Sequence, residues 1–134
     1  MNAIQAELTC PVAEAEELVR EELAKAGFGV LCEVDVAGTL RQKLGVERPP
    51  LKILGVCNPD LAYRALELDP SVSLLLPCNV VLEAVDAGTR VAAADPVSLM
   101  PGAALAEVAS DAREKLASAI GRLAEALGEK QDAR

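Results

Sequence analysis

Two Cys-Asn pairs are the residues of this chain best suited to chemistry. Cys57-Asn58 ends one apolar segment, and Cys78-Asn79 lies near the start of the next. They are polar, chemically versatile groups set within segments that are otherwise hydrophobic. A thiol is a nucleophile and a ligand for soft metals, and a carboxamide both donates and accepts hydrogen bonds. We therefore select Cys57, Asn58, Cys78 and Asn79 as the candidate ligand-binding residues.

Each pair also has a simpler interpretation. Asn58-Pro59 is typical of a helix start, so Cys57 would lie where free N–H groups favour anions and lower a cysteine pKa. Equally, Asn58 caps the helix and Cys57 is a small buried hydrophobe. Cys57 and Cys78 on neighbouring strands could form a thiol pair that binds Cu(I) or zinc or cycles through a disulfide, but plain packing also explains them. We predict no catalytic residue and no metal ligand, with Cys57 and Cys78 as the alternative metal ligands.

Four further residues have weaker chemical potential. Cys10 precedes Pro11 at a predicted helix start, where the dipole would stabilise a thiolate, or where Cys10 is simply a poor cap. Cys32 falls on the apolar side of its strand and is expected in the core. Glu33 and Asp35 could do acid-base work or hold a hard cation, although a solvated strand face explains them better.

The composition narrows the function classes. The 134 residues fit one domain that buries roughly two thirds of the surface of its unfolded chain. Aromatic residues make up only 1% of the chain, so the core must be aliphatic and sites that stack bases or flat cofactors are disfavoured. The net charge of −8, with scattered basic residues, disfavours nucleic acid and anionic membrane surfaces as partners. The chain has no histidine, which excludes a catalytic triad that needs an imidazole.

The location follows from the N-terminus and the apolar segments. The opening MNAIQAELTC has neither the positive start nor the apolar run of a secretory signal. No segment approaches about 18 uncharged apolar residues, so no membrane span is expected. We therefore expect a cytoplasmic protein whose cysteines are reduced. The chain has no C-x-x-C, which leaves a zinc ribbon or a thioredoxin motif without support.

Periodicity and turn residues predict an alternation of strands and helices. Pro77 cannot donate a ladder hydrogen bond, which argues for an edge position or a bulge in its strand. Gly128 is the expected end of a long amphipathic helix, so residues 1–128 form the domain and 129–134 a frayed tail. Strands are expected over 3–8, 28–36, 51–57, 74–85 and 90–94, and helices over 11–26, 37–44, 59–68, 95–100 and 103–128.

This order of elements predicts the α+β class. Helices that are apolar on one side pack economically against one mixed or antiparallel sheet, all on the same face. The C-terminal helix should cross much of that sheet, and its length also suits a dimer contact.

Four short segments resemble one known family. They are GFGVL from Gly27, ILGVCNP from Ile53, LPCNVV from Leu76, and Asp95-Pro96 after the hairpin. In this order and spacing they are similar to the domain of unknown function 302 family of bacteria and archaea, over residues 14–100. The resemblance implies a compact α+β fold similar to the TATA-binding-protein-like class, and a homodimer. It implies no activity.

We therefore expect a cytoplasmic homodimer of unknown biochemical role, acting as a small-ligand or partner-binding module without catalysis. Its ligand and any cofactor are unknown. The alternative is a thiol-based soft-metal-binding or redox protein that uses Cys57 and Cys78. A third hypothesis is an enzyme whose cavity is polarised by Asn58 and Asn79, with Glu33 or Asp35 as the base.

Overall fold

One five-stranded antiparallel sheet organises the computed structural model, which describes residues 1–100 and 102–132, with side-chain surroundings up to residue 125. The strand order is β1-β5-β4-β3-β2, so the last strand of the chain lies beside the first. This confirms the predicted α+β class with a single sheet. The strands are β1 (Ala3–Leu8), β2 (Gly29–Asp35), β3 (Leu51–Cys57), β4 (Cys78–Val85) and β5 (Gly88–Ala94).

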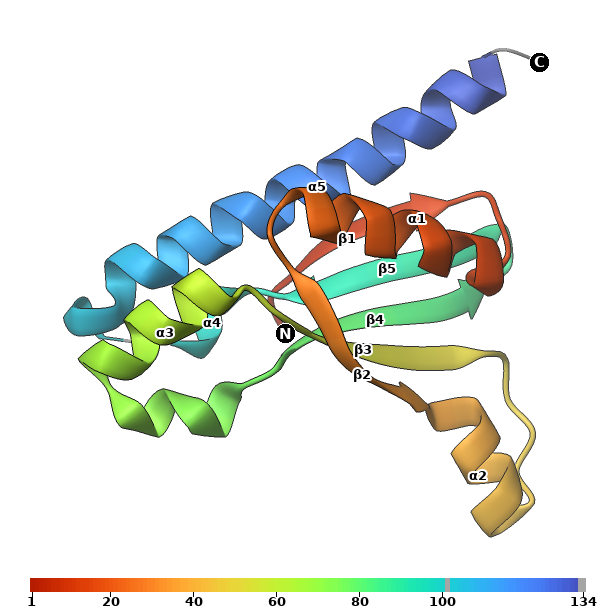
Figure 1. Ribbon diagram of the computed structural model, residues 1–134. Helices are drawn as coiled ribbons and strands as arrows, with labels where there is room; N and C mark the ends of the chain where they lie inside the picture. The colour runs from red at the N-terminus through yellow and green to blue at the C-terminus, as the bar shows by residue number, and fades with distance from the viewer. Residues whose placement is uncertain (101, 133–134) are drawn as a thin grey trace.

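The helices lie on one face of the sheet, as predicted. The longest, α5, runs diagonally across the sheet beside α1, and α3 packs against α5 at one end (Figure 1). In contrast, α2 projects from the end of β2 and has no buried residue. The helices are α1 (Val12–Lys25), α2 (Val36–Leu44), α3 (Pro59–Leu68), α4 (Pro96–Leu99) and α5 (Ala106–Asp132), with 3-10 turns η1 (Pro70–Leu75) and η2 (Ala103–Leu105).

The end of α5 differs from the prediction. The helix continues through Gly128 to Asp132. A glycine costs a helix only about 1 kcal/mol relative to alanine, which does not by itself end it. The predicted tail, residues 129–134, lies partly outside the described residues. The side-chain surroundings of residues 126–134 and the backbone of 133–134 are not described.

An aliphatic core fills the space between the sheet and α1, α3 and α5. Alternate strand residues point to the helices, and Leu54, Val80, Leu82 and Val91 are fully buried there. They meet Val19 and Leu23 of α1 and Leu116 and Ile120 of α5 in one continuous cluster. Apart from Phe28 and Cys10, this core is built from Ala, Val, Leu and Ile, as the composition predicts.

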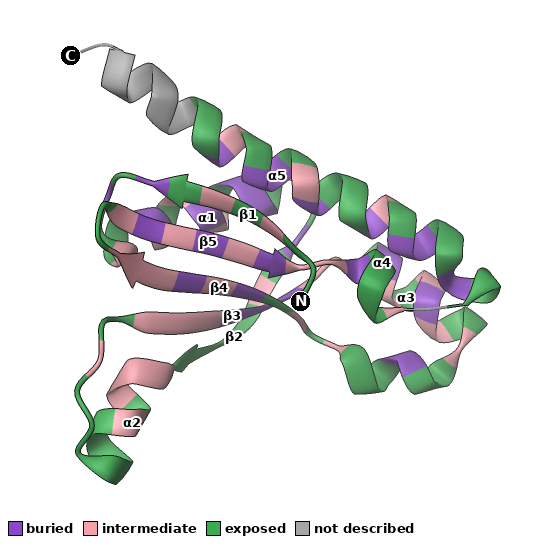
Figure 2. Ribbon diagram, turned by 180° about the vertical axis from the view of Figure 1, so that it is seen from behind, coloured by how far each residue is buried: buried purple, intermediate pink, exposed green. Residues whose placement is uncertain are grey.

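Among the residues that the structure describes, no helix covers the other side of the sheet, which we call the open face (Figure 2). Residues paired across antiparallel strands point to the same side, so the register arranges the open-face side chains in three rows. The first row contains Glu7, Arg90, Glu83 and Leu51, the middle row Gln5, Ala92, Val81, Ile53 and Val34, and the third row Ala3, Ala94, Asn79, Gly55 and Cys32.

Cys32 is exposed on this open face, so its predicted place in the core is wrong. The cause is a shift of register in β2. Val30 pairs with Val56 on the helix side, but Cys32 pairs with Gly55, because Leu31 is an extra residue between them. Such a bulge reverses the alternation of side chains that follow it.

The expectation that Pro77 lies at an edge position or at a bulge in its strand is also wrong. β4 lies inside the sheet between β3 and β5. Pro77 is compatible with this position because the strand begins only at Cys78, so no ladder hydrogen bond is needed from Pro77. The preceding Leu74 and Leu75, expected in the strand, belong to η1.

Candidate functional site

Asn58 links two helices at the end of β3. Its Oδ1 accepts a hydrogen bond from the backbone N–H of Leu61 at 3.2 Å, which confirms that it caps α3. Its Nδ2 donates to the carbonyl oxygen of Ala26 at the end of α1, at 3.4 Å. Gly27 makes room for this contact, because its φ is +88° and a Cβ there would lie 2.9 Å from Nδ2. The amide is therefore fully engaged in holding the fold.

Cys57, Asn58 and Cys78 come together around one apolar cavity under α3. The cavity offers about 30 Å³ of space. One water needs about 10–15 Å³, whereas small-molecule sites span about 300–1,000 Å³. The cavity therefore has no more space than one or two waters would fill, which is too small for a larger ligand. Its other lining residues are Phe28, Leu61, Ala62, Ala65, Leu76, Met100, Val108 and Ala112.

The two cavity thiols differ in their surroundings. Burial, and then the nearby Cys57, raises the pKa of the Cys78 thiol above its ordinary value. Cys78 is therefore protonated at neutral pH, which slows both nucleophilic attack and metal binding. Cys57 is half-buried. Among the described residues, no three His, Cys, Asp or Glu side chains are grouped so that they could hold a metal ion.

Asn79 lies apart from the other three candidates. Successive strand residues point to opposite faces, so Cys78 faces the helices and Asn79 the open face. There Asn79 lines a groove of about 400 Å³, most of whose surface is apolar. We call it the open-face groove. Its other lining residues are Met1, Asn2, Ala3, Val81, Ala92, Ala93, Ala94, Ser98 and Leu99.

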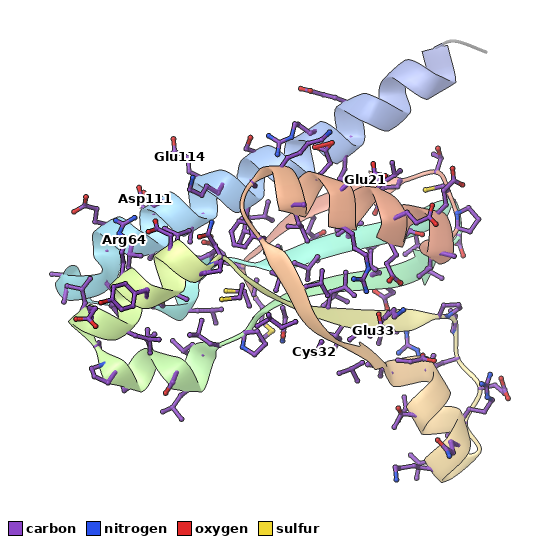
Figure 3. The ribbon with its side chains drawn as sticks, in the orientation of Figure 1. Glu21, Cys32, Glu33, Arg64, Asp111 and Glu114 are labelled. Atoms are coloured by element: carbon purple, nitrogen blue, oxygen red, sulfur yellow. The ribbon has the colours of Figure 1, made fainter. Side chains whose placement is uncertain are left out.

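Glu33 belongs to a cluster of four charges between α1 and the edge of the sheet. Arg20 Nη2 donates to Glu33 at 2.7 Å and its Nε to Glu16 at 2.9 Å. Lys52 Nζ lies 2.8 Å from Glu16 and 3.4 Å from Glu33. The hydrogen bond from Lys52 lowers the pKa of Glu16 against the effect of burial, and the same bond raises the pKa of Lys52. Figure 3 shows Glu33 beside Cys32 on β2.

Asp35 and Cys10 both contribute to the fold, as a helix cap and as a core residue. Asp35 caps α2, since its Oδ1 accepts from the backbone N–H of Gly38 at 2.9 Å. Cys10 is buried in the core, and its carbonyl oxygen accepts from the Thr89 hydroxyl at 2.8 Å. The fold does not bring Glu33 or Asp35 together with both Asn58 and Asn79, so the arrangement required by the enzyme hypothesis is not formed.

One charged groove was missed by the sequence reasoning. It lies between the end of α1, α3 and α5 and has about 630 Å³ of open space. Arg64 of α3 and Asp111 of α5 form an ion pair across it at 3.0 Å, visible in Figure 3. Its charges come from three helices far apart in the chain, so sequence spacing gave no signal. Both signs are present, in Lys25, Asp60, Arg64, Asp111, Glu114, Lys115 and Arg122.

The fold and its cavities define a small α+β protein, with helices on one face of an antiparallel sheet and an apolar groove on the other. The family model described as "Domain of unknown function DUF302" matches residues 4–123, and the chain belongs to this family. The match includes the predicted region 14–100 and extends into α5.

A solved structure supports the same assignment. The crystal structure of an uncharacterized conserved DUF302 protein from Bacillus stearothermophilus is similar to this chain, with a TM-score of 0.84 and 32% sequence identity. The similarity covers 92% of this chain and 98% of that one. A comparison with curated proteins finds no match. Within the described residues, no helix has the length and apolar character needed to cross a membrane.

Proposed function

We propose that this protein is a homodimeric binding module without catalytic activity that works in the cytoplasm. The observation that carries the proposal is the open face with its groove of about 400 Å³. This volume lies in the range of ligand sites, and exposed apolar surface of this kind marks interaction sites. The open-face groove would receive either a small apolar ligand or side chains of a partner.

The use of the polar candidate residues supports binding over catalysis. Asn58 and Asp35 cap helices, and Glu33 is held by Arg20 and Lys52. A general acid or base must reach a proton of the substrate. Groups that are already bound to backbone or to cations in this way are poorly placed for that task.

Two observations support a homodimer in a reducing compartment. α2 has no buried residue, and Leu44 at its end is 70% exposed, so this helix has apolar surface available for a partner. Cys32, Cys57 and Cys78 are free thiols, which fits the cytoplasm.

Native mass spectrometry of the full chain tests the proposal. The expected result is a species of twice the chain mass of 14.0 kDa, populated more strongly as the concentration rises. A monomer at every concentration would contradict the homodimer. The melting temperature measured with and without short-chain fatty acids or alcohols then tests whether the open-face groove binds small apolar ligands. Binding should raise the melting temperature.

The second candidate function is thiol-based soft-metal binding or redox activity. It is favoured by one observation, the closeness of Cys57 and Cys78, since the nearby Cys57 adds to the rise in the pKa of the Cys78 thiol. The raised pKa of Cys78 weighs against it. The test is to purify the protein in air without chelators and to measure its intact mass. Bound metal would favour the thiol function over the binding module. So would a mass two hydrogens below that of the reduced chain, provided that this deficit disappears in Cys57→Ser.

A further inference from the structure

Four charges form an alternating row across the open face. Arg90 on β5 lies 3.2 Å from Glu7 on β1 and 3.7 Å from Glu83 on β4. Arg48, in the loop before β3, lies 3.2 Å from Glu83. From β1 towards β3 the signs therefore run negative, positive, negative, positive. We call these residues the charge row.

The charge row is neutral in a chain whose net charge is −8. The helix side is different, because α1 exposes Glu14, Glu17 and Glu21 to solvent there. Two copies that met through α1 would bring these like charges together, whereas two open faces would bring together neutral rows. The open face is thus electrostatically suited to self-association.

An alternating row of four charges is also complementary to itself when it is reversed. We propose that two copies pack open face against open face, about a two-fold axis that runs parallel to the strands between β5 and β4. Glu7 then faces the partner's Arg48, and Arg90 faces the partner's Glu83. This arrangement rests on the proposed homodimer and names its interface.

The middle row fits the same axis. Ala92 packs on the partner's Val81, and Gln5 covers the partner's Ile53. A two-fold axis perpendicular to the strands would instead place the charge row on the third row, which carries Ala94 and Asn79. That arrangement would bury the charges without new partners, at a high cost. The charges therefore select the axis parallel to the strands.

The size of the open face explains the role of α2. Five strands about 4.8 Å apart and three rows about 6.7 Å apart make a plane of about 500 Å². A standard interface buries about 800 Å² on each partner. With the axis between β5 and β4, β2 and α2 extend one strand beyond the partner's β1. Leu44 of α2 and Val46 after it are exposed apolar residues outside this plane, and they can supply the missing contact area.

Charge swaps test this interface. Glu83→Arg places like charges opposite each other at two equivalent positions in the dimer, and we expect it to weaken dimerisation about 10- to 100-fold. Reversal of the whole row, by Glu7→Arg, Arg48→Glu, Glu83→Arg and Arg90→Glu together, keeps it alternating and self-complementary, so the dimer should return. Glu17→Arg, a change of the same charge on the helix side, is the matched control and should leave the dimer intact. Light scattering coupled to size-exclusion chromatography gives the masses over a dilution series.

An apolar variant gives a second, independent readout. Val81→Arg should yield monomers, whereas Leu74→Arg should not, because Leu74 is 86% exposed on η1 and belongs to none of the three rows of the open face. Circular dichroism and melting curves confirm that each variant is folded. If Val81→Arg does not fold, the charge swaps decide the question alone.

The outcomes separate this interface from the homodimer itself. A wild-type monomer overturns both, and leaves the open face to a different partner. A wild-type dimer that survives Glu83→Arg and Val81→Arg overturns the interface and leaves the homodimer. A dimer broken by Glu83→Arg but not restored by reversal of the whole row overturns the proposed axis. Rescue by that reversal supports the whole arrangement.

Discussion

Asn58 is a residue type suited to ligand binding, but in this fold its side chain has a structural role. Both ends of its amide are bonded, to Leu61 and to Ala26. Asn58→Ala should lower the free energy of unfolding by about 1 kcal/mol, because the first turn of α3 loses its cap. Urea denaturation measures this, with Asn79→Ala as the control. Equal stability of Asn58→Ala and wild type would show that the cap does not stabilise the fold.

The cysteines should differ in reactivity according to their surroundings. Cys32 is exposed on the open face, whereas burial raises the pKa of Cys78. A thiol reagent at pH 7.5 should therefore modify Cys32 within minutes and Cys78 only after denaturation or at higher pH. Peptide mass spectrometry assigns the labelled sites, and Cys32→Ser should remove the fast phase. Fast labelling of Cys78 in native protein would contradict its burial and revive the thiol function.

At the scale of elements, Glu22 joins the two large helices. Its buried carboxylate accepts from Arg122 Nε of α5 at 2.6 Å and from Lys25 Nζ at 2.8 Å. The hydrogen bonds from Lys25 and then Arg122 lower its pKa. Glu22→Gln should cost up to about 1 kcal/mol of stability, since both cations lose a charged partner but remain partly exposed to water. Glu21 is exposed on the same helix, so Glu21→Gln is the control. Equal losses of stability in the two variants would show that Glu22 does not specifically stabilise the contact between α1 and α5.

Stability should depend on pH through the same helices. The folded pKa values of Glu16 and Glu22 lie below the ordinary value of 4.5, so their stabilisation is complete above about pH 4.5 and is lost as the pH falls through the folded values. The folded pKa of Lys52 lies above 10.5, so its stabilisation is complete below that pH and is lost as the pH rises further.

The pH prediction has a clear measurement. Urea midpoints should fall on acidification below pH 4.5, and Glu16→Gln should make this fall shallower without changing the trend above pH 5. The partial exposure of these ion pairs keeps the effect small, and added salt should reduce it. If the urea midpoint of Glu16→Gln falls below pH 4.5 as steeply as that of wild type, Glu16 does not contribute to the acid dependence of stability.

β2 illustrates the limit of periodicity at the scale of elements. Strict alternation predicts Val30, Cys32 and Val34 on one buried side. The bulge at Leu31 keeps Val30 on the helix side and turns the other two to the open face. The bulge depends on pairing with β3, some 25 residues further along the chain, so local sequence does not reveal it.

At the scale of the whole molecule, function depends on the side of the sheet that the helices leave uncovered. The sequence predicts one covered face but not what the other face carries. The charge row draws Glu7, Arg48, Glu83 and Arg90 from four segments, and the open-face groove joins the start of β1, part of β4 and the end of β5 to α4. These surfaces provide the basis for the proposed dimer.

The elements, the α+β class and the Asn58 cap follow largely from the sequence, because periodicity and capping depend on residues within about four positions of one another. Other features arise only when the chain folds: the strand order, including the pairing of β3 with β4 that brings Cys57 near Cys78, the separation of Asn79 from the cavity beside Cys78, and the contact of Glu22 with Arg122, 100 positions apart. Such features depend on the register between distant strands and on helices meeting across the core, where local periodicity carries no information.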